Sequence, residues 1–418
     1  AGEEEHGSVR LPRSAGGKGR READEANKPA EVEAIEAFLF SQAEFRHNVI
    51  THHCEIRWTE EAGFLPLTDR DVNTLWGRMN KTVGRVYLTD IYNVIHSEFV
   101  PLFNPFQSYF DHLPSWDGVS DPIGDLADTV HVKSDQAEFR DYFRKWFVGI
   151  LPALLDDTVV NHEILVLIGE QGLYKTTWFN FLLPPELRCY FYTKTNSDRL
   201  NKDDLFSLTE FALICFEELD GMRPAELNQL KAMVTMPYVN ERAAYGRNKE
   251  RHPHIASFCG TGNNVQFLTD PTGNRRWLPF EVSQIRDPHL HAIPYELVYS
   301  QAYALWKSGF CHWFSQEEIR KLNMHNSRFE VPNLEEDLIR THFRKPFEGE
   351  AGIFVTAADI LEQISSCLRY PLSPNKIGRI MAGLEFESIR YKGKRGYIAV
   401  KKTGEDIDRE RRSGALGL

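Results

Sequence analysis

Residues 164–179, ILVLIGEQGLYKTTWF, join an apolar run to residue types that can hold a phosphate. A phosphate-binding loop needs a buried strand, a turn whose backbone N–H groups face the anion, and a helix whose N-terminus points at it. Gly169 and Gly172 permit such a turn. Lys175 could reach the terminal phosphates of ATP, and the Thr176 hydroxyl could bind Mg²⁺. The predicted nucleotide-binding residues are Gly169, Gly172, Tyr174, Lys175, Thr176 and Thr177.

One position departs from the usual loop, because Tyr174 stands where a glycine normally precedes the lysine. A side chain at this place disfavours a positive φ. We therefore expect Tyr174 to keep a negative φ and to point its ring out of the loop. The departure bears on the rate of hydrolysis more than on nucleotide binding.

Carboxylates end the next apolar run, in FALICFEELDG at residues 211–221. In an NTPase one such carboxylate acts on Mg²⁺ through water, and the next polarises the attacking water. Glu217 is predicted for the metal and Glu218 for the water. The pair Glu218 and Asp220 is the alternative, because alternate residues of a strand share a face.

Two further groups complete a hydrolytic constellation. The run HIASFCGTGNN ends in amides, and in ring-forming NTPases a strand between the two motif strands carries a polar residue that orients the lytic water. Asn263 is predicted for this role, with Asn264 as the alternative. In DPTGNRRWLPFEV, Arg275 or Arg276 could reach a neighbouring subunit's γ-phosphate as an arginine finger, and the sequence does not choose between them.

Basic and aromatic residues alternate in LNQLKAMVTMPYVNERAAYGRNKERHPHIA, between the acidic strand and the Asn263 strand. Aromatic rings stack on bases and cations hold phosphates, so this segment predicts contact with single-stranded DNA, in a loop facing a central pore. A solvated charged hairpin is the alternative. The predicted contacts are Lys231, Arg242, Tyr245, Arg247, Lys249 and Arg251.

The elements that position these residues predict an α/β protein with a P-loop NTPase core. Residues 1–30 are rich in charge and glycine and predict disorder. Capped helical patterns predict a mostly helical N-terminal domain over 31–125 and the ATPase domain over 126–330. Residues 340–402 predict two helices and a basic hairpin, the layout of a winged helix, and 403–418 form a charged tail.

The basic hairpin carries Lys392, Lys394 and Arg395, which suit contact with a duplex backbone, although a winged helix can also dock a protein. The formal net charge of −11 excludes a surface that is basic everywhere but not a basic channel. No apolar run approaches the roughly 20 residues that span a bilayer. The 6 cysteines form no CxxC pair, which favours reduced thiols and a cytoplasmic location.

The order of these motifs resembles the virulence-associated E family of phage and mobile-element proteins. The resemblance rests on NPFQSYFDHLPSWDG, GEQGLYKTT, EELDGMRPAELNQLKAMVT, YGRNKERHP and DPTGNRRWLPFEV, from Asn104 to Val282. It implies a P-loop ATPase of the AAA+ and superfamily 3 helicase type, related to the helicase half of viral primase-helicases. Because such relatives often carry a primase-like domain upstream, a primase is a candidate partner.

Three hypotheses follow from the sequence. The first is an ATP-dependent helicase-type motor, working as a homo-oligomeric, hexameric ring on single-stranded DNA. The second is a nucleotide-gated DNA-binding initiator or repressor with little turnover, which Tyr174 favours and the paired carboxylates disfavour. The third is an interaction ATPase whose winged helix docks a protein and whose turnover ignores DNA.

Overall fold

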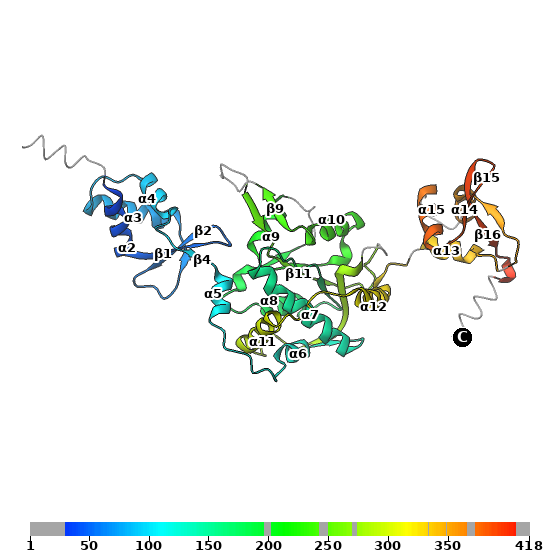
Figure 1. The fold of residues 1–418 in the computed structure, drawn as a ribbon, viewed down its shortest axis with the longest axis horizontal. Coiled ribbons are helices and arrows are strands. Elements are labelled where there is room, and N and C mark those ends of the chain that lie inside the picture. Colours follow the sequence, from blue (N-terminus) through cyan, green and yellow to red (C-terminus); the bar gives the residue numbers. More distant parts are fainter. Residues whose placement is uncertain are drawn as a thin grey trace, which may run out of the picture. The chain divides into compact units, whose positions relative to one another are not determined.

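The structure is a computed structural model, and it describes residues 30–195, 202–241, 250–269, 274–332, 334–347, 349–365 and 373–406. The fold is mixed α/β with several sheets (Figure 1). The chain divides into two compact units, Ala1–Val265 with Thr272–Ser327 and Gln266–Pro271 with Arg328–Leu418. Nearly all of the segment predicted to be disordered and most of the predicted tail lie outside the described residues. The finer domain boundaries stay predictions.

A six-stranded sheet lies at the centre of the first unit. Its strands are, in spatial order, β5 (Val130–Val132), β12 (Trp277–Ile285), β6 (Ile164–Ile168), β11 (Ser257–Gly262), β8 (Leu213–Phe216) and β7 (Phe191–Lys194). Neighbouring strands are parallel, except that β5 runs antiparallel to β12. Every residue of β6, β11 and β8 is buried. The unbroken apolar sequences of β6 and β8 follow from burial on both faces of a parallel sheet.

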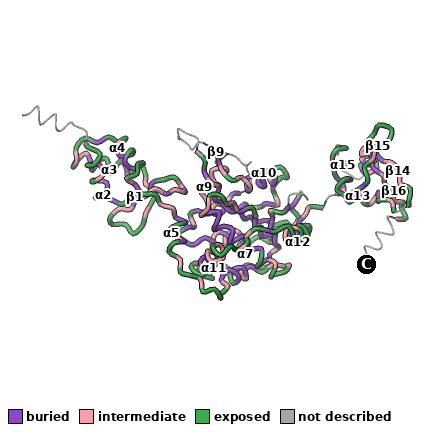
Figure 2. The backbone as a smooth tube through the Cα atoms, viewed as in Figure 1, coloured by how far each residue is buried: buried purple, intermediate pink, exposed green. Residues whose placement is uncertain are grey.

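Helices and short elements surround this sheet, and buried residues gather along its strands and α7 (Figure 2). The helices are α5 (Pro105–Asp111), α6 (Pro122–Ala127), α7 (Gln136–Leu155), α8 (Lys175–Leu182), α9 (Lys202–Glu210), α10 (Pro224–Val234), α11 (Tyr295–Lys307) and α12 (Gln316–Asn326). The 3₁₀ turns are η1 (Arg188–Tyr190), η2 (Leu219–Gly221) and η3 (Asn274–Arg276). β9 (Tyr238–Glu241) pairs with β10 (Glu250–Pro253).

Helix α7 anchors the sheet through buried aromatic side chains. Trp146 donates from Nε1 to the carbonyl of Phe258 on β11, at 2.9 Å. The Phe143 ring lies 5.5 Å from the Trp178 ring of α8. These contacts bring the helix that follows the predicted phosphate loop onto the same core as the strands. The position of α8 is therefore set by packing as well as by the loop.

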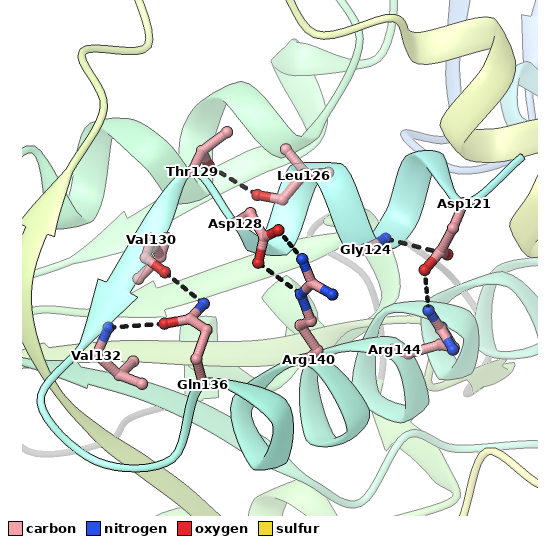
Figure 3. Close-up of polar contacts among 10 residues, drawn as sticks. All are labelled: Asp121, Gly124, Leu126, Asp128, Thr129, Val130, Val132, Gln136, Arg140 and Arg144. Atoms are coloured by element: carbon pink, nitrogen blue, oxygen red, sulfur yellow. Dashed lines mark hydrogen bonds and ion pairs between the residues drawn. The ribbon is translucent and has the colours of Figure 1, made fainter.

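Two arginines of α7 also hold the segment that leads into the sheet (Figure 3). Arg140 makes a two-pronged contact with the Asp128 carboxylate, and Arg144 pairs with Asp121, which caps α6. Gln136 donates to the Val130 carbonyl at 2.9 Å. The antiparallel edge strand β5 is thus fixed to the helix that follows it in the chain.

The N-terminal part of the first unit combines helices with a sheet ordered β3-β2-β1-β4. Its elements are α2 (Val32–Gln42), β1 (Ala43–Asn48), β2 (His53–Trp58), β3 (Leu65–Pro66), α3 (Asp69–Thr82), α4 (Leu88–Ile95) and β4 (Leu102–Phe103). The predicted Thr/Asp cap is present, since Thr68 and Asp71 form a capping box at the start of α3. The β1–β2 hairpin recruits two further short strands to this sheet, and the mostly helical domain stays a prediction.

The second unit has helices packed against its own antiparallel sheet, ordered β13-β16-β14 with β15 also paired to β16. Its elements are η4 (Ser327–Phe329), α13 (Leu334–His342), β13 (Phe343–Arg344), β14 (Ile353–Val355), α14 (Ala357–Ser365), α15 (Pro374–Gly383), β15 (Ser388–Tyr391) and β16 (Lys394–Lys401). The β15–β16 turn has positive φ at Lys392 (48°) and Gly393 (79°), as a tight two-residue hairpin requires. The predicted basic hairpin thus forms a hairpin turn.

Candidate functional site

A cleft of about 350 Å³ opens at the carboxyl ends of β6, β8 and β11. The carboxyl edge of a parallel sheet is where ligands of open α/β folds bind. The cleft is lined by Gln171, Gly172, Leu173, Tyr174, Lys175, Thr176, Thr177, Glu217, Glu218, Thr261, Gly262 and Asn263. The predicted loop, the predicted carboxylates and the predicted amide therefore meet in one place. β11 lies between β6 and β8, which is the position predicted for the strand that ends at Asn263.

The turn between β6 and α8 has the backbone conformation of the usual phosphate loop, although Tyr174 replaces the glycine before the lysine. Gly172 has φ 84° and Tyr174 has φ 60°, both in the left-handed region. The expectation of a negative φ at Tyr174 is therefore wrong. The Trp178 N–H already bonds to the Tyr174 carbonyl at 2.7 Å, so the chain must swing into α8 at this residue. A left-handed residue with a side chain costs about 1–2 kcal/mol. The Tyr174 side chain is 42% exposed and lines the cleft.

Lys175 begins α8, and its side chain turns back into the loop. Its Nζ donates to the carbonyls of Gly169 at 2.6 Å and Glu170 at 2.7 Å, and lies 3.4 Å from the Asn263 side-chain oxygen. Burial lowers the pKa of the Lys175 ammonium, and the Asp220 carboxylate opposes this effect. The ammonium is thus held between the loop and the end of β11, where the terminal phosphates of a nucleotide would lie.

Thr176 and Glu217 form the pair that fits a metal ion. The Thr176 hydroxyl donates to the Glu217 carboxylate at 2.8 Å. Neighbouring ligands of an octahedral Mg²⁺, each about 2.1 Å from the ion, lie about 3 Å apart. These two oxygens therefore have the separation of adjacent metal ligands, and both are hard donors of the kind that Mg²⁺ prefers.

The carboxylates of Glu218 and Asp220 lie in different surroundings. Glu218 lines the cleft in a left-handed conformation, with φ 54°. Asp220 instead accepts the backbone N–H groups of Asn263 at 3.1 Å and Asn264 at 3.0 Å. Because Asp220 is committed to the end of β11, the geometry favours Glu217 and Glu218 over the alternative pair. The roles of both stay predictions.

The sequence did not identify Asp220 as the anchor of Asn263. The signal in the sequence is the pair of glycines in β11, Gly260 and Gly262. A Cβ at Gly260 would come within 2.2 Å of the Leu219 side chain, and one at Gly262 within 3.1 Å of the Asp220 carboxylate. Glycine at these two positions lets η2 approach β11, and this approach sets the position of the predicted water-orienting amide.

The predicted arginine pair lies at the opposite end of the sheet. Trp277 pairs with Ile164, so Arg276 lies level with Glu163 at the amino end of β6, whereas the loop follows its carboxyl end. The five residues of β6 lie between Glu163 and Gly169, which puts these two residues about 20 Å apart. Arg275 is exposed and Arg276 is half-buried. Burial lowers the pKa of Arg276, Arg275 adds to this effect and Glu163 opposes it.

The residues predicted to touch single-stranded DNA are only partly described. Lys231 on α10 is 9% exposed, so its placement does not favour a phosphate contact. It lies on the face by which α10 packs, beside the buried Leu230 and Val234. Arg251 stacks over the Tyr238 ring at 3.3 Å on the β9–β10 hairpin. Outside the described residues lie Arg242, Tyr245, Arg247 and Lys249.

The predicted basic wing is exposed in the second unit. Lys392, Lys394 and Arg395 lie at the tip of the β15–β16 hairpin. Arg395 donates from Nε to the Ser388 hydroxyl at 3.2 Å, and the Lys392 ammonium lies 5.3 Å from the centre of the Tyr391 ring. Their approach to DNA stays a prediction.

Residues 111–331 match the model of the virulence-associated protein E-like domain. This match covers more than half of the chain, and the chain belongs to this family. Among the described residues, no helix is long and apolar enough to cross a membrane.

Solved structures similar to the chain include the apo structure of the NrS-1 C terminal region (305-718). That similarity has 11% identity and a TM-score of 0.46, and it covers 89% of this chain and 99% of the other. The A form apo structure of the same region is 11% identical with a TM-score of 0.44, at the same coverage of both chains. No curated protein matches the chain.

Proposed function

We propose that this chain is an ATP-hydrolysing motor of replication type from a phage or mobile element. The observation that carries the proposal is the convergence of three neighbouring strands on one cleft. There, Lys175, the Thr176–Glu217 pair and Asn263 meet within hydrogen-bonding reach. The strand order, with the amide-ended β11 between the loop strand and the acidic strand, also supports this proposal. It is the arrangement expected of a ring-forming NTPase.

In this proposal the nucleotide's phosphates lie at the N-terminus of α8, where free N–H groups and the helix dipole favour anions. Lys175 exchanges its two carbonyl partners for phosphate oxygens. Thr176 and Glu217 would hold Mg²⁺, and the bound ion would neutralise phosphate charge. Glu218 polarises the attacking water, and Asn263 orients it. Water attacks the γ-phosphorus in line, and ADP leaves.

The work that hydrolysis would drive is movement along single-stranded DNA. The Arg251–Tyr238 stack of the β9–β10 hairpin supports a contact of this kind, since it combines a cation with an aromatic face. The segment that joins the two strands contains four of the predicted contacts. The exposed Lys392, Lys394 and Arg395 suit a second contact, with duplex DNA, made by a C-terminal winged helix.

A second candidate is a nucleotide-gated DNA-binding protein with little turnover. The left-handed Tyr174 favours it, because a strained loop could bind nucleotide without reaching the geometry for hydrolysis. The Thr176–Glu217 contact and the cleft position of Glu218 favour turnover. Both candidates place ATP in the same cleft, and they differ only in the chemical step.

ATP hydrolysis by the purified protein, with and without single-stranded DNA, separates the candidates. Lys175→Ala is the inactive control, and Lys321→Ala is the matched one, since Lys321 is exposed on α12 in a pair with Glu317. Turnover that rises with DNA, disappears in Lys175→Ala and persists in Lys321→Ala supports the motor. Nucleotide binding without turnover rejects the motor and leaves the gated binding protein. Turnover that ignores DNA instead supports an interaction ATPase.

A further inference from the structure

The arginine turn η3 is fixed by a side chain from a distant helix. Asn326, the last residue of α12, donates from Nδ2 to the carbonyl of Asn274 at 2.8 Å and to the carbonyl of Trp277 at 3.0 Å. These two carbonyls stand immediately before and after Arg275 and Arg276. Asn326 is 0% exposed, so no water competes for its amide. The buried Asn326 side chain therefore fixes the backbone on both sides of the arginine pair, an arrangement called the clamp below.

The residue before the clamp is itself anchored, which makes the clamp rigid. One ring nitrogen of His325 lies 2.7 Å from the Pro279 carbonyl on β12, and the other lies 2.9 Å from the Glu138 carboxylate on α7. The end of α12 is thus tied to β12 and α7 at once. Holding an arginine this firmly matters when its guanidinium must reach a fixed point, because less side-chain and backbone entropy is lost on contact.

The two arginines differ in how far they are prepared for such a contact. Arg276 is half-buried, and the register of β12 with β6 places it level with Glu163. Arg275 is exposed and faces solvent. An exposed arginine loses much of its rotamer freedom when it is immobilised. The half-buried Arg276 has less of this freedom left to lose.

The target of this arginine lies outside its own subunit. The cleft is about 20 Å away, at the other end of the sheet, and neither arginine lines it. Within that cleft Lys175 is the one cation among the described lining residues, although it would hold a triphosphate next to Glu217 and Glu218. A second cation is therefore missing from the cleft of a single copy, and the arginine turn of another copy can supply it.

We propose that Asn326 is a positioning residue that holds the arginine turn so that Arg276, rather than Arg275, enters the nucleotide cleft of a second copy of this chain. The inference rests on the proposed function, since it assigns a role in ATP hydrolysis. It adds which arginine acts, which residue positions it and why a single copy is incomplete.

The test compares steady-state ATP hydrolysis, as separate kcat and KM values, in the full chain. The variants are Asn326→Leu, which keeps the volume and removes both donors, Arg276→Lys and the matched Arg275→Lys. We expect Arg276→Lys to lower kcat more than about 100-fold with little change in KM, and Arg275→Lys to lower it less than about 3-fold. Asn326→Leu should lower kcat about 10-fold at unchanged KM.

A mixing experiment distinguishes positioning from simple structural damage. Lys175→Ala subunits have a dead cleft and an intact arginine turn, whereas Asn326→Leu subunits have the reverse. In an equal mixture about half of the intact clefts meet an intact turn, so turnover per Asn326→Leu subunit should rise about five-fold. The same mixing should rescue Arg276→Lys, which changes only the guanidinium and keeps the assay informative if Asn326→Leu folds poorly.

Each outcome decides the matter. Rescue of both variants by Lys175→Ala subunits supports the proposal. Unchanged kcat in Asn326→Leu, a larger loss in Arg275→Lys than in Arg276→Lys, or failure of Lys175→Ala subunits to rescue Arg276→Lys overturns it while leaving the ATPase proposal intact. Absence of turnover in the unsubstituted protein overturns the proposed function, and this inference with it.

Discussion

At the carboxyl ends of β6, β8 and β11, the candidate reactive side chains stand on strained and exposed backbone, with positive φ at Tyr174 and Glu218. At the amino end of the same sheet, the arginine turn stands on backbone closed by the buried amide of Asn326. The backbone around the cleft is thus strained, whereas hydrogen bonds at the other end of the sheet restrict the conformation of the arginine turn.

The difference follows from what each end must do in the proposed mechanism. A cleft that surrounds a ligand needs N–H groups converging on one point, and left-handed residues produce this convergence. An arginine that reaches into another subunit needs a fixed base instead, because its own side chain supplies the reach. Backbone strain at the cleft and hydrogen bonding at the arginine turn are therefore two ways of preorganising a binding site.

The largest effect expected at the strained end comes from Glu217→Gln, which keeps the shape and removes the charge facing Thr176. We expect kcat to fall about 10²–10³-fold and the required Mg²⁺ concentration to rise. Turnover measured against Mg²⁺ concentration checks this result, with the exposed Glu317→Gln of α12 as the matched control. An unchanged Mg²⁺ requirement would assign the metal to Glu218 instead.

The clamped end is broken by Asn326→Leu, which leaves the carbonyls of Asn274 and Trp277 without these donors. The free energy of unfolding should fall by about 2–3 kcal/mol, because buried carbonyls lose their hydrogen bonds. Urea unfolding measures the loss. Asn323→Leu, at an exposed position of the same helix, is the control and should change stability little. Equal stability of the two variants would contradict the clamp.

A smaller effect is expected from Glu163→Gln beside the arginine turn. Burial raises the pKa of Glu163 to about 7. A raised carboxyl pKa means that the folded state disfavours the charge, so this residue lowers stability increasingly as pH rises from its ordinary value towards 7. The variant should gain about 1–2 kcal/mol over the unsubstituted protein at pH 8, and less at pH 5. A gain that is equal at both pH values, measured by urea unfolding, would reject this explanation.

The smallest effect tests the strain itself. Tyr174→Gly and Tyr174→Ala both remove the ring, but alanine keeps the Cβ that opposes φ 60°. The glycine variant should therefore be about 1 kcal/mol more stable than the alanine variant. Urea unfolding of the pair gives the difference. Equal stabilities would mean that the loop relaxes around a side chain, and the contrast between the two ends of the sheet would weaken.

Much of the cleft could be predicted from the sequence because each of its parts is local. A strand, a loop with Lys175 and Thr176, and a strand ending in Glu217 are patterns of adjacent residues. Tyr174 was misjudged because its own steric preference was considered without the geometry that closes β6 onto α8. Lys231 was predicted at the surface because its charge was considered without the face on which α10 packs.

The parts that sequence reasoning missed depend on contacts between distant segments. Asp220, which follows β8, accepts the backbone N–H groups of Asn263 and Asn264 after the neighbouring β11, and Asn326 reaches η3 from another helix. An asparagine at a helix end is ordinarily a cap or a surface residue, and nothing in its neighbours marks it as a clamp. The strands β3 and β4 are two residues each, too short to give an alternating pattern.

Backbone carbonyls of the loop compete with an incoming anion for the Lys175 ammonium. The Lys175 ammonium is already bound to the carbonyls of Gly169 and Glu170, so an incoming anion competes with these two internal acceptors for its N–H groups. A single orthophosphate would form few more hydrogen bonds than the carbonyl hydrogen bonds that it replaces. In the proposed function, a triphosphate with its metal would make many contacts at once and would outweigh the exchange. The closed loop should therefore reject free phosphate at concentrations that would otherwise fill the cleft, and it should release the cleaved phosphate readily.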